Sequence, residues 1–145
     1  RSALIRAVVY MPHYDHQSLA KALIDRAYDI HARYSHDARE LETAIREHDC
    51  HLLMVFAPRR VADLGKVLSQ LTPYLLRWQV AISVVGAPPT VEQAHRLKRA
   101  AVTDYSILPM GGATLGRRLK RAVAMKQEMG AWDYMQLSDP MLSAA

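Results

Sequence analysis

The sequence is poor in cysteine, in phenylalanine and in long apolar runs. Its single cysteine, Cys50, excludes an internal disulfide and fits a reducing compartment, where we expect a buried and unreactive thiol. No apolar segment approaches the roughly 18 to 20 residues that cross a bilayer, and the start lacks the apolar core of a signal peptide. These absences predict a soluble cytoplasmic protein without a membrane partner. The chain begins at Arg1 rather than Met, which suggests a fragment of a longer protein.

The composition is that of a folded domain with a basic excess. Half of the residues (50%) are apolar and 23% are charged, a composition that argues against disorder. A length of 145 residues suffices for one domain with its own core. The net charge is +5. A basic surface permits an anionic partner without requiring one. Many of the cations fall in the C-terminal third: Arg96, Lys98, Arg99, Arg117, Arg118, Lys120, Arg121 and Lys126.

Five apolar stretches have the length and composition of β-strands. The central one, His51–Pro58, is an unbroken apolar run that ends at a proline, which is typical of a parallel strand buried on both faces. Residues 80–85 form a second such run, whereas Ile30, Ala32 and Tyr34 alternate as in a half-buried strand. The predicted strands are 6–11, 29–34, 51–56, 80–85 and 104–108.

Apolar residues at helical spacing follow each predicted strand. The third helix is expected to end by Thr72, because Pro73 cannot continue it without the loss of a hydrogen bond. The predicted helices have their apolar positions within residues 19–27, 38–48, 61–71, 90–100 and 115–129. The expected N-terminal caps are Asp15, Asp37 with Glu40, and Thr90 with Gln93.

Strands alternating with helices predict an α/β fold, a (βα)5 flavodoxin-like three-layer sandwich. Right-handed crossovers then give a parallel sheet of strand order 2-1-3-4-5. We assign residues 1–129 to this domain, and the loss of helical pattern over 130–145 predicts a linker or docking tail. Two interpretations stay open for the apolar residues at this end: they pack back on the domain, or they continue the fifth helix into a dimerising or signalling helix. These residues are Met125, Met129, Trp132, Tyr134 and Met135.

Four stretches of the chain carry a resemblance to a known family. They are 27–30 before the second strand, 51–56 as the third strand, 78–87 around the fourth and 100–110 around the fifth. Their order and spacing resemble those of response-regulator receiver domains over roughly residues 4 to 126. The last stretch is similar to the family's fifth strand, with its aromatic residue and closing Lys-Pro. The resemblance implies the receiver fold, with Tyr105 at the position of the family's switch aromatic residue.

The same resemblance locates the family's phosphorylation site on residues that lack its chemistry. Receivers hold magnesium with an acidic pair, accept the phosphoryl group on an aspartate, and contact its oxygens through a Ser or Thr and a lysine. These positions fall at Met11 and Pro12, at Phe56 (or Ala57 if the register slips by one), at Gly86 and at Leu108. Met11 and Pro12 offer no side-chain oxygen to a hard dication, and Phe56 is no carboxylate nucleophile. The chain therefore resembles a degenerate pseudo-receiver without the phospho-acceptor aspartate.

The resemblance implies a regulatory domain rather than an enzyme. We expect a non-phosphorylatable protein-interaction module of a bacterial signalling or transcriptional regulator, with no cofactor. It would bind a protein partner or itself, the homodimer forming through the fourth helix, fifth strand and fifth helix. Nucleic acid would be contacted only through an output domain outside this sequence. An enzyme of the same architecture would need converging polar groups at the strand ends, where the sequence supplies only His13, Asp15 and His16.

Five arginines on the fourth and fifth helices are candidates for binding an anion or a partner. They are Arg96, Arg99, Arg117, Arg118 and Arg121. The alternative function is a ligand-binding regulatory domain for a nucleotide second messenger such as a cyclic dinucleotide, since some binders of that ligand carry the Arg117-x-x-x-Arg121 spacing. A solvated helix face is the simpler interpretation of these cations. Binding of single-stranded nucleic acid would require aromatic residues between these cations, and none is present.

The first loop contains His13, Asp15 and His16, which could ligate a transition metal. Their spacing matches no established site and no fourth ligand is evident. A solvated loop with a helix cap explains these residues better, and we predict no metal.

Overall fold

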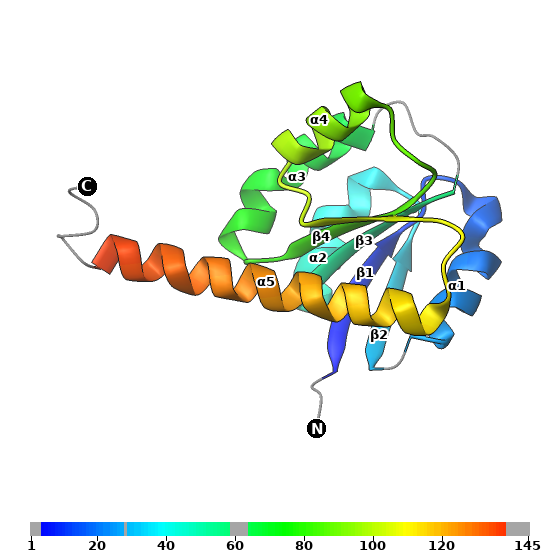
Figure 1. Ribbon diagram of the computed structural model, residues 1–145, viewed down its shortest axis with the longest axis horizontal. Coiled ribbons are helices and arrows are strands. Elements are labelled where there is room, and N and C mark those ends of the chain that lie inside the picture. Colours follow the sequence, from blue (N-terminus) through cyan, green and yellow to red (C-terminus); the bar gives the residue numbers. More distant parts are fainter. Residues whose placement is uncertain (1–3, 28, 59–63, 139–145) are drawn as a thin grey trace.

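A parallel five-stranded sheet forms the centre of the computed structural model (Figure 1), which describes residues 4–27, 29–58 and 64–138. The strands are β1 (Ile5–Tyr10), β2 (Ile30–Ser35), β3 (Leu52–Ala57), β4 (Ala81–Gly86) and β5 (Asp104–Ile107). Their order is β2-β1-β3-β4-β5, and all neighbours run parallel. The predicted strand order is confirmed, and each predicted strand boundary lies within one residue of the observed one.

Helices cover both faces of the sheet, as the three-layer prediction requires. They are α1 (Gln17–Asp25), α2 (Leu41–His48), α3 (Leu64–Arg77), α4 (Val91–Arg99) and α5 (Gly112–Ser138), with short 3-10 helices η1 (Tyr14–His16) and η2 (Ala38–Glu40) before α1 and α2. One hydrophobic cluster joins the sheet to α2, α3 and α4 through residues such as Ile45, Leu68 and Leu97. The other joins it to α1 and α5, for example through Ile24 and Leu119.

Burial along the strands follows the sequence pattern. All six residues of β3 and all six of β4 are buried, which confirms the prediction of strands covered on both faces. On the edge strand β2, half-buried Ile30, Ala32 and Tyr34 alternate with exposed residues, as predicted. Cys50, just before β3, is buried, and burial raises the pKa of its thiol to about 11. The thiol is therefore protonated and unreactive at neutral pH.

Helix α3 corrects the prediction that Pro73 ends it, because the helix continues to Arg77. Proline has no amide hydrogen to donate to the preceding turn. The residues beyond it nevertheless bury an apolar side chain, since Leu75 is packed in the cluster under α3. The Thr72 hydroxyl donates to the main-chain oxygen of Leu68 at 2.8 Å, which adds a local bond in the turn before the proline. Burial of Leu75 outweighs the hydrogen bond that Pro73 cannot make.

Of the predicted N-terminal caps, one lies at the start of its predicted helix and two do not. Thr90 and Gln93 form the expected capping box of α4, with reciprocal bonds of 3.1 Å. Asp37 accepts from the amide of Arg39 at 2.9 Å, but it caps the 3-10 helix η2 rather than α2. Asp15 does not cap α1, because that helix begins after η1, at Gln17, with His16 as its N-cap residue and no side-chain cap. The two inserted 3-10 turns displace both aspartates from the α-helix starts.

Helix α5 corrects the prediction for the C-terminal residues, because the helix runs through residues 130–138 without a break. Its 27 residues correspond to a length of about 40 Å at 1.5 Å per residue. Figure 1 shows the red end of α5 projecting beyond the sheet. Continuation of the fifth helix was the second of the two interpretations. Residues 139–145 lie outside the described range, so the division at residue 129 stays a prediction.

Two glycines let the first turns of α5 approach the end of α1. A Cβ added at Gly112 would lie 2.3 Å from Cβ of Arg26 and 2.9 Å from the main-chain oxygen of Leu23. One added at Gly116 would lie 3.3 Å from the Cα of Ala27. The helices can sit this close only because both positions lack a side chain. An ion pair of 3.2 Å between Lys120 and Asp29 holds the next turn of α5 near the start of β2.

We expect Gly112→Ala to lower the free energy of unfolding by about 1–3 kcal/mol, the usual cost of overpacking, because the methyl group meets main-chain and Cβ atoms that cannot rotate away. Urea denaturation followed by circular dichroism measures this change. Gly111→Ala is the matched control, since nothing lies within 4 Å of a Cβ at Gly111. Equal effects of the two substitutions would contradict the close packing.

Candidate functional site

The carboxyl ends of parallel strands are where ligands bind in open α/β sheets, and the five predicted site positions lie there. Met11 and Pro12 follow β1, Phe56 is the last but one residue of β3, and Gly86 ends β4. Leu108 follows β5 directly. The strand register pairs Ala57 with Gly86, so the ends of β3 and β4 are level. The structure thus brings all five positions to one edge of the sheet.

Apolar side chains fill the space at this edge. Met11 and Phe56 are both 0% exposed and belong to the cluster between the sheet, α1 and α5. Leu108 and Met110, from the loop after β5, are half-buried and pack against the same cluster. The core therefore extends to the strand ends, where a polar pocket would otherwise lie.

Gly86 is required by the main chain around it. A Cβ added there would lie 2.1 Å from the main-chain oxygen of Ala57, so no side chain fits without displacement of β3 or β4. That oxygen accepts a hydrogen bond of 3.2 Å from the amide of Ala87, and the oxygen of Gly86 accepts one of 2.9 Å from the amide of Leu108. The ends of β3, β4 and β5 are thereby joined through their main chains. A serine or threonine hydroxyl cannot occupy position 86 in this arrangement.

Prolines follow four of the five strands at this edge. They lie within three residues of the ends of β1, β3, β4 and β5: Pro12, Pro58, Pro88, Pro89 and Pro109. Phosphate sites at strand ends are usually built from amide hydrogens of the following loop and helix. Proline has no amide hydrogen. The loops of this edge are therefore poor in donors for a phosphoryl group.

The first loop places two histidines together. The rings of His13 and His16 make an edge-on contact, with centroids 5.6 Å apart and planes at 85°. Nε2 of His13 and Nδ1 of His16 are buried without a hydrogen-bond partner. Asp15, between them in sequence, is exposed. Over the described ranges, no three His, Cys, Asp or Glu residues are arranged to hold a metal ion.

Tyr105 is held against the loop that follows β4. Its hydroxyl donates a hydrogen bond to the main-chain oxygen of Ala87, and its half-buried ring packs against the cluster under α2, α3 and α4. The residue that the resemblance gives as the switch aromatic residue is therefore bonded to the loop after β4 and packed on the core.

The candidate arginines do not form one site. Arg96 is paired with Glu92 at 2.6 Å on α4, and Arg117 donates to the hydroxyl of Thr114 at 3.2 Å on α5. Arg99 lies exposed on α4. Arg118 and Arg121 line a surface cavity of about 280 Å³ together with Thr103, Asp104, Ala122 and Met125. The structure thus brings together only two of the five arginines, and their cavity also contains a carboxylate.

Neither a family model nor a curated protein sequence matches the chain, whereas solved structures match its shape. A CheY-like response-regulator receiver domain from Methanospirillum hungatei JF-1 has a TM-score of 0.70 at 14% identity, covering 88% of this chain and 100% of that one. The signal receiver domain of a modulated diguanylate cyclase from Desulfovibrio desulfuricans G20 has a TM-score of 0.68 at 16% identity, covering 87% and 98%. The chain has the receiver fold.

A third similar structure belongs to a longer protein. NtrX from Brucella abortus, solved in complex with ADP, matches the receiver fold of this chain with a TM-score of 0.72 at 14% identity. The match covers 92% of this chain and 29% of that one. At such identities the likeness establishes the fold. Within the described part of the receiver fold, no helix is long and apolar enough to span a membrane.

Arg118 has a structural role that the sequence did not reveal. Its guanidinium donates to both carboxylate oxygens of Asp104, at 3.0 and 3.2 Å, and to the main-chain oxygen of Tyr105 at 3.0 Å. The hydrogen bonds that Arg118 donates to the carboxylate of Asp104 raise the pKa of Arg118. These contacts fix α5 to β5. Asp104 and Arg118 are 14 residues apart, on either side of the loop between β5 and α5. No local sequence pattern therefore indicates that they are in contact.

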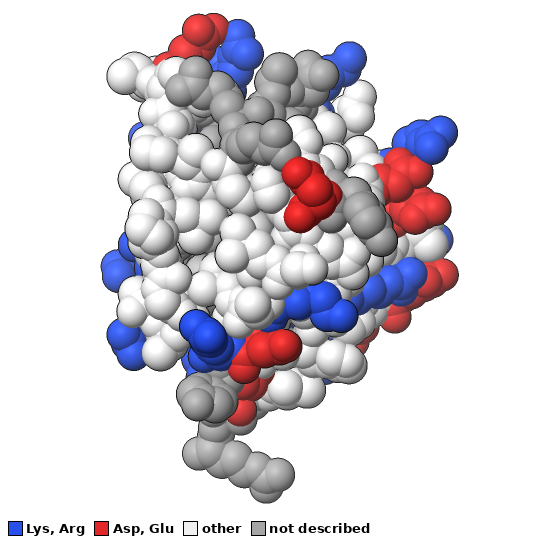
Figure 2. All heavy atoms as spheres, turned by 90° about the vertical axis from the view of Figure 1, so that its right-hand side faces the viewer, with Lys and Arg blue, Asp and Glu red and all other residues white. Residues whose placement is uncertain are grey.

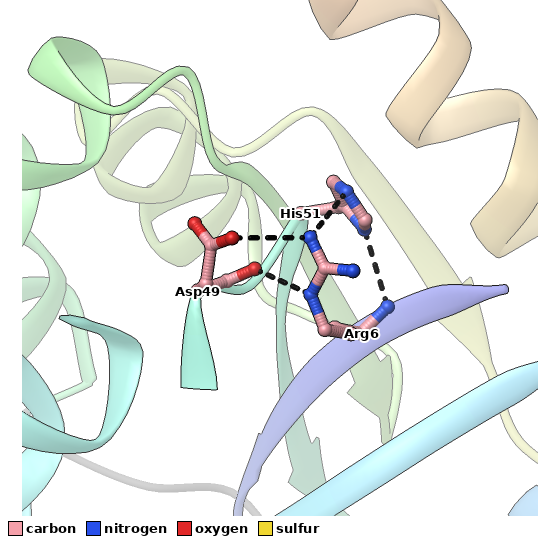
Figure 3. A network of polar contacts seen from close by, with 3 residues as sticks. All are labelled: Arg6, Asp49 and His51. Carbon is pink, nitrogen blue, oxygen red and sulfur yellow. Dashed lines mark hydrogen bonds and ion pairs between the residues drawn. The ribbon is translucent and has the colours of Figure 1, made fainter. Parts of the chain in front are cut away.

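A second polar network lies at the opposite edge, where β1 and β3 begin (Figure 3). Nε of Arg6 donates to the main-chain oxygen of Asp49 at 2.8 Å, and Nη2 lies 3.3 Å from the carboxylate of Asp49. The amide of Arg6 donates to Nδ1 of His51 at 3.2 Å, and Nη2 lies 3.2 Å from Nε2 of the same ring. Both ring nitrogens of His51 therefore face N–H groups of Arg6.

This arrangement disfavours a charged His51. Burial lowers the pKa of the ring, and the neighbouring guanidinium of Arg6 lowers it further. Asp49 acts in the opposite direction but more weakly. A protonated ring would have no nitrogen left to accept from Arg6 and would add a positive charge beside it. The folded state therefore favours the neutral ring of His51 more than the unfolded chain does.

We expect Arg118→Met to lower the free energy of unfolding by about 1 kcal/mol, because the ion pair is half-exposed but also includes a main-chain bond. Urea denaturation measures the change, and a double-mutant cycle with Asp104→Asn isolates the pair. Arg117→Met is the matched control on the same helix, and we expect it to change the free energy of unfolding by less than about 0.5 kcal/mol. A zero coupling energy in the cycle would show that Asp104 does not hold Arg118.

We expect the free energy of unfolding to fall as the pH drops below about 6.5, the pKa of an unfolded histidine. The unfolded chain then binds a proton at His51 that the folded chain, with its lowered pKa, does not. The stabilisation is fully present above that pH, and its loss is complete below the folded pKa. Urea denaturation from pH 8 to pH 5 measures the slope.

His51→Gln should make this slope shallower, since the group that takes up the proton is gone. His95→Gln, on the exposed side of α4, is the matched control and should leave the slope as it is in the native sequence. A native slope that persists in His51→Gln would refute the assignment to His51.

Proposed function

We propose that the chain is a regulatory domain of the receiver fold that acts by binding protein and does not carry a phosphoryl group. The observation that carries this proposal is the burial of Phe56 at the end of β3, where the resemblance locates the phosphoryl acceptor. An acyl phosphate needs a carboxylate nucleophile that solvent and donor can reach. Phe56 has no nucleophile, and it is enclosed by the core.

The surrounding positions support the same conclusion independently. Met11 is buried and Pro12 has no side-chain oxygen, so neither can bind magnesium, which is ligated by oxygen. Gly86 has no room for a hydroxyl, and Leu108 packs against the core in place of a lysine. Four groups that act together in the family's chemistry are thus replaced by residues that continue the core. We therefore infer a pseudo-receiver rather than a receiver with one substitution.

The domain is proposed to belong to a larger bacterial signalling or transcriptional regulator. The similar structure from Desulfovibrio desulfuricans is the receiver domain of a diguanylate cyclase, and NtrX is more than three times the length matched. Helix α5, which projects past the sheet, would lead to an attached output domain. Any contact with nucleic acid would be made by that domain. A cytoplasmic location is proposed from the single reduced Cys50.

The partner is proposed to be an acidic protein surface. Five exposed cations lie on the two helices that flank the edge strand β5, and we call them together the basic face: Arg96, Lys98 and Arg99 on α4, and Arg117 and Arg121 on α5. Glu92 and Asp104 are already used in ion pairs with Arg96 and Arg118. A two-fold homodimer through this face would place cations opposite cations. An acidic partner is therefore favoured over the predicted homodimer through α4, β5 and α5.

A nucleotide ligand has weaker support at the same face. The cavity beside α5 contains Arg118 and Arg121, but Arg118 is neutralised by Asp104, whose carboxylate also lines the cavity. A phosphate entering it would meet that carboxylate. Arg117, the first arginine of the Arg117-x-x-x-Arg121 spacing, does not line the cavity.

Incubation with acetyl phosphate and magnesium, followed by intact mass spectrometry, tests the proposal. We expect no phosphoryl adduct on the native chain, with a receiver that has its acidic site run in parallel as the positive control. Phe56→Asp should not restore phosphorylation, because Met11 and Pro12 still provide no magnesium ligand. It should also destabilise the fold by several kcal/mol more than Phe56→Leu, since it buries a carboxylate without a partner. An aspartyl phosphate on the native chain would overturn the proposed function.

A further inference from the structure

Strand β2 leaves one edge of the sheet open. It pairs with β1 on one side, and no described strand pairs with its other side (Figure 1). Soluble proteins usually protect such an edge with a proline, a bulge, a very short strand or an inward-pointing charge. β2 has six residues, Ile30–Ser35, in unbroken register with β1, and none of them is proline or glycine. Arg33, its one Lys or Arg residue, is paired with Glu47 of α2 at 2.9 Å, so β2 has the features of a strand that can pair further.

The main-chain groups of alternate β2 residues point out of this edge. The amide of Ile5 donates to the main-chain oxygen of Asp29 at 2.8 Å, and the residues of β2 pair in step with those of β1 from there. In a β-strand the N–H and C=O of one residue point to the same side, and that side alternates from residue to residue. The odd-numbered residues of β2 are therefore bonded to β1. Ile30, Ala32 and Tyr34 offer their N–H and C=O groups to the outside.

The opposite edge strand, β5, is better protected. It has four residues, and the guanidinium of Arg118 lies against it, bonded to Asp104 and to the main-chain oxygen of Tyr105. Pro109 follows the strand after one intervening residue. Addition of a strand is therefore expected at β2 rather than at β5.

The part of the chain around β2 is close to neutral, although the whole chain has a net charge of +5. Residues 17–48, which include α1, β2 and α2, contain five Lys or Arg and six Asp or Glu residues. Helix α2 contacts β2, and α1 reaches it where Lys21 lies over the ring of Tyr34, 5.8 Å from its centroid. Figure 2 shows that the surface charge is uneven: basic side chains stand alone along the left margin of that view and are mixed with acidic ones along the right margin. Two copies of a basic chain repel each other least where they meet through a neutral region.

We propose that two copies of the chain associate by antiparallel pairing of their β2 strands about a two-fold axis at Ala32, which joins the two sheets into one. In this register Ala32 faces its own copy, and Ile30 faces Tyr34 of the second copy. Each outward-pointing residue then exchanges main-chain hydrogen bonds with another outward-pointing residue, and none is left over. The contact is isologous, the same strand on both copies.

The side chains of β2 favour a second copy as the strand that is added. On the α1 side of the sheet, half-buried Ile30 would meet the ring of Tyr34, and apolar–aromatic cross-strand pairs of this kind stabilise antiparallel strands. On the α2 side, Arg33 would lie opposite His31, and Glu47 offsets the charge of Arg33. Register, side chains and the neutral surroundings thus agree on the same two-fold arrangement.

The inference goes beyond the proposed function and does not depend on it. β2 and β5 lie at opposite ends of the sheet, so the basic face beside β5 stays accessible in the dimer. A phosphoryl adduct would overturn the proposed function without bearing on the dimer. A monomeric chain would overturn the dimer without bearing on phosphorylation.

Sedimentation velocity of the full chain over a concentration series tests the dimer. We expect the native chain to dimerise and Ala32→Pro to raise the dissociation constant by at least about tenfold, because proline removes the outward amide at the centre of the contact. Proline is tolerated on an edge strand where its nitrogen faces outward, so the variant is expected to fold. Ala32→Gly is the matched control, since it also alters the backbone preference of the strand but keeps the amide. It should change the dissociation constant by less than about threefold.

Amide hydrogen exchange on the native chain tests the register without any substitution. The amides of Ile30, Ala32 and Tyr34 point outward, so we expect each to exchange at least about tenfold more slowly at a protein concentration that favours the dimer than at one that favours the monomer. The amides of His31 and Arg33 bond to β1 in both states and should change far less.

Three results would overturn the β2 dimer. The first is a native chain that stays monomeric at the highest concentration, which would leave the edge for a strand of a different protein. The second is a dimer weakened as much by Ala32→Gly as by Ala32→Pro. The third is a dimer in which the outward amides of β2 keep their exchange rates and which Arg99→Glu alters, because the contact would then lie on the basic face. Circular dichroism verifies that each variant is folded, and the exchange measurement on the native chain decides the matter even where a variant is not.

Discussion

Burial of β3 and β4 on both faces is the constraint on which the rest of the structure depends. Two strands without a polar face need helices above and below, and these supply the clusters of α2, α3 and α4 on one side and of α1 and α5 on the other. Charged residues are consequently confined to the outer sides of the helices and to the sheet edges. The same burial reaches the end of β3, where Phe56 extends the core to the edge that a receiver uses for chemistry.

The outer sides of α4 and α5 carry exposed cations as a result: Arg96, Lys98, Arg99, Arg117 and Arg121. The proposed attraction of an acidic partner to these cations would act from a distance and would weaken as the ionic strength rises. Arg118 is already paired with Asp104 and would take no part in that attraction.

The sequence was sufficient for features set by local pattern and insufficient for those set by tertiary packing. Apolar runs located β3 and β4, and Thr90 with Gln93 located the start of α4, because these signals lie within a few residues. The prediction that Pro73 ends α3 was wrong. The hydrogen bond that the proline removes is a local loss, whereas the burial of Leu75 that offsets it comes from packing in the core. The predicted site positions do lie at the strand ends, but their correspondence to the family's phosphorylation site stays a prediction. The reason that position 86 is glycine, contact with the oxygen of Ala57, required the neighbouring strand.

Helix α5 converts local packing into distant movement. Its first turns are seated on Arg26 and Ala27 through Gly112 and Gly116, and its distal half extends past the sheet. Main-chain hydrogen bonds tie the turns of the helix together, so it would act as a lever arm whose fulcrum is the glycine contact. A small tilt at that fulcrum becomes a larger displacement at Ser138, in proportion to the distance along the axis. Whatever follows Ser138 would therefore register a change in the α1–α5 contact as a change of position.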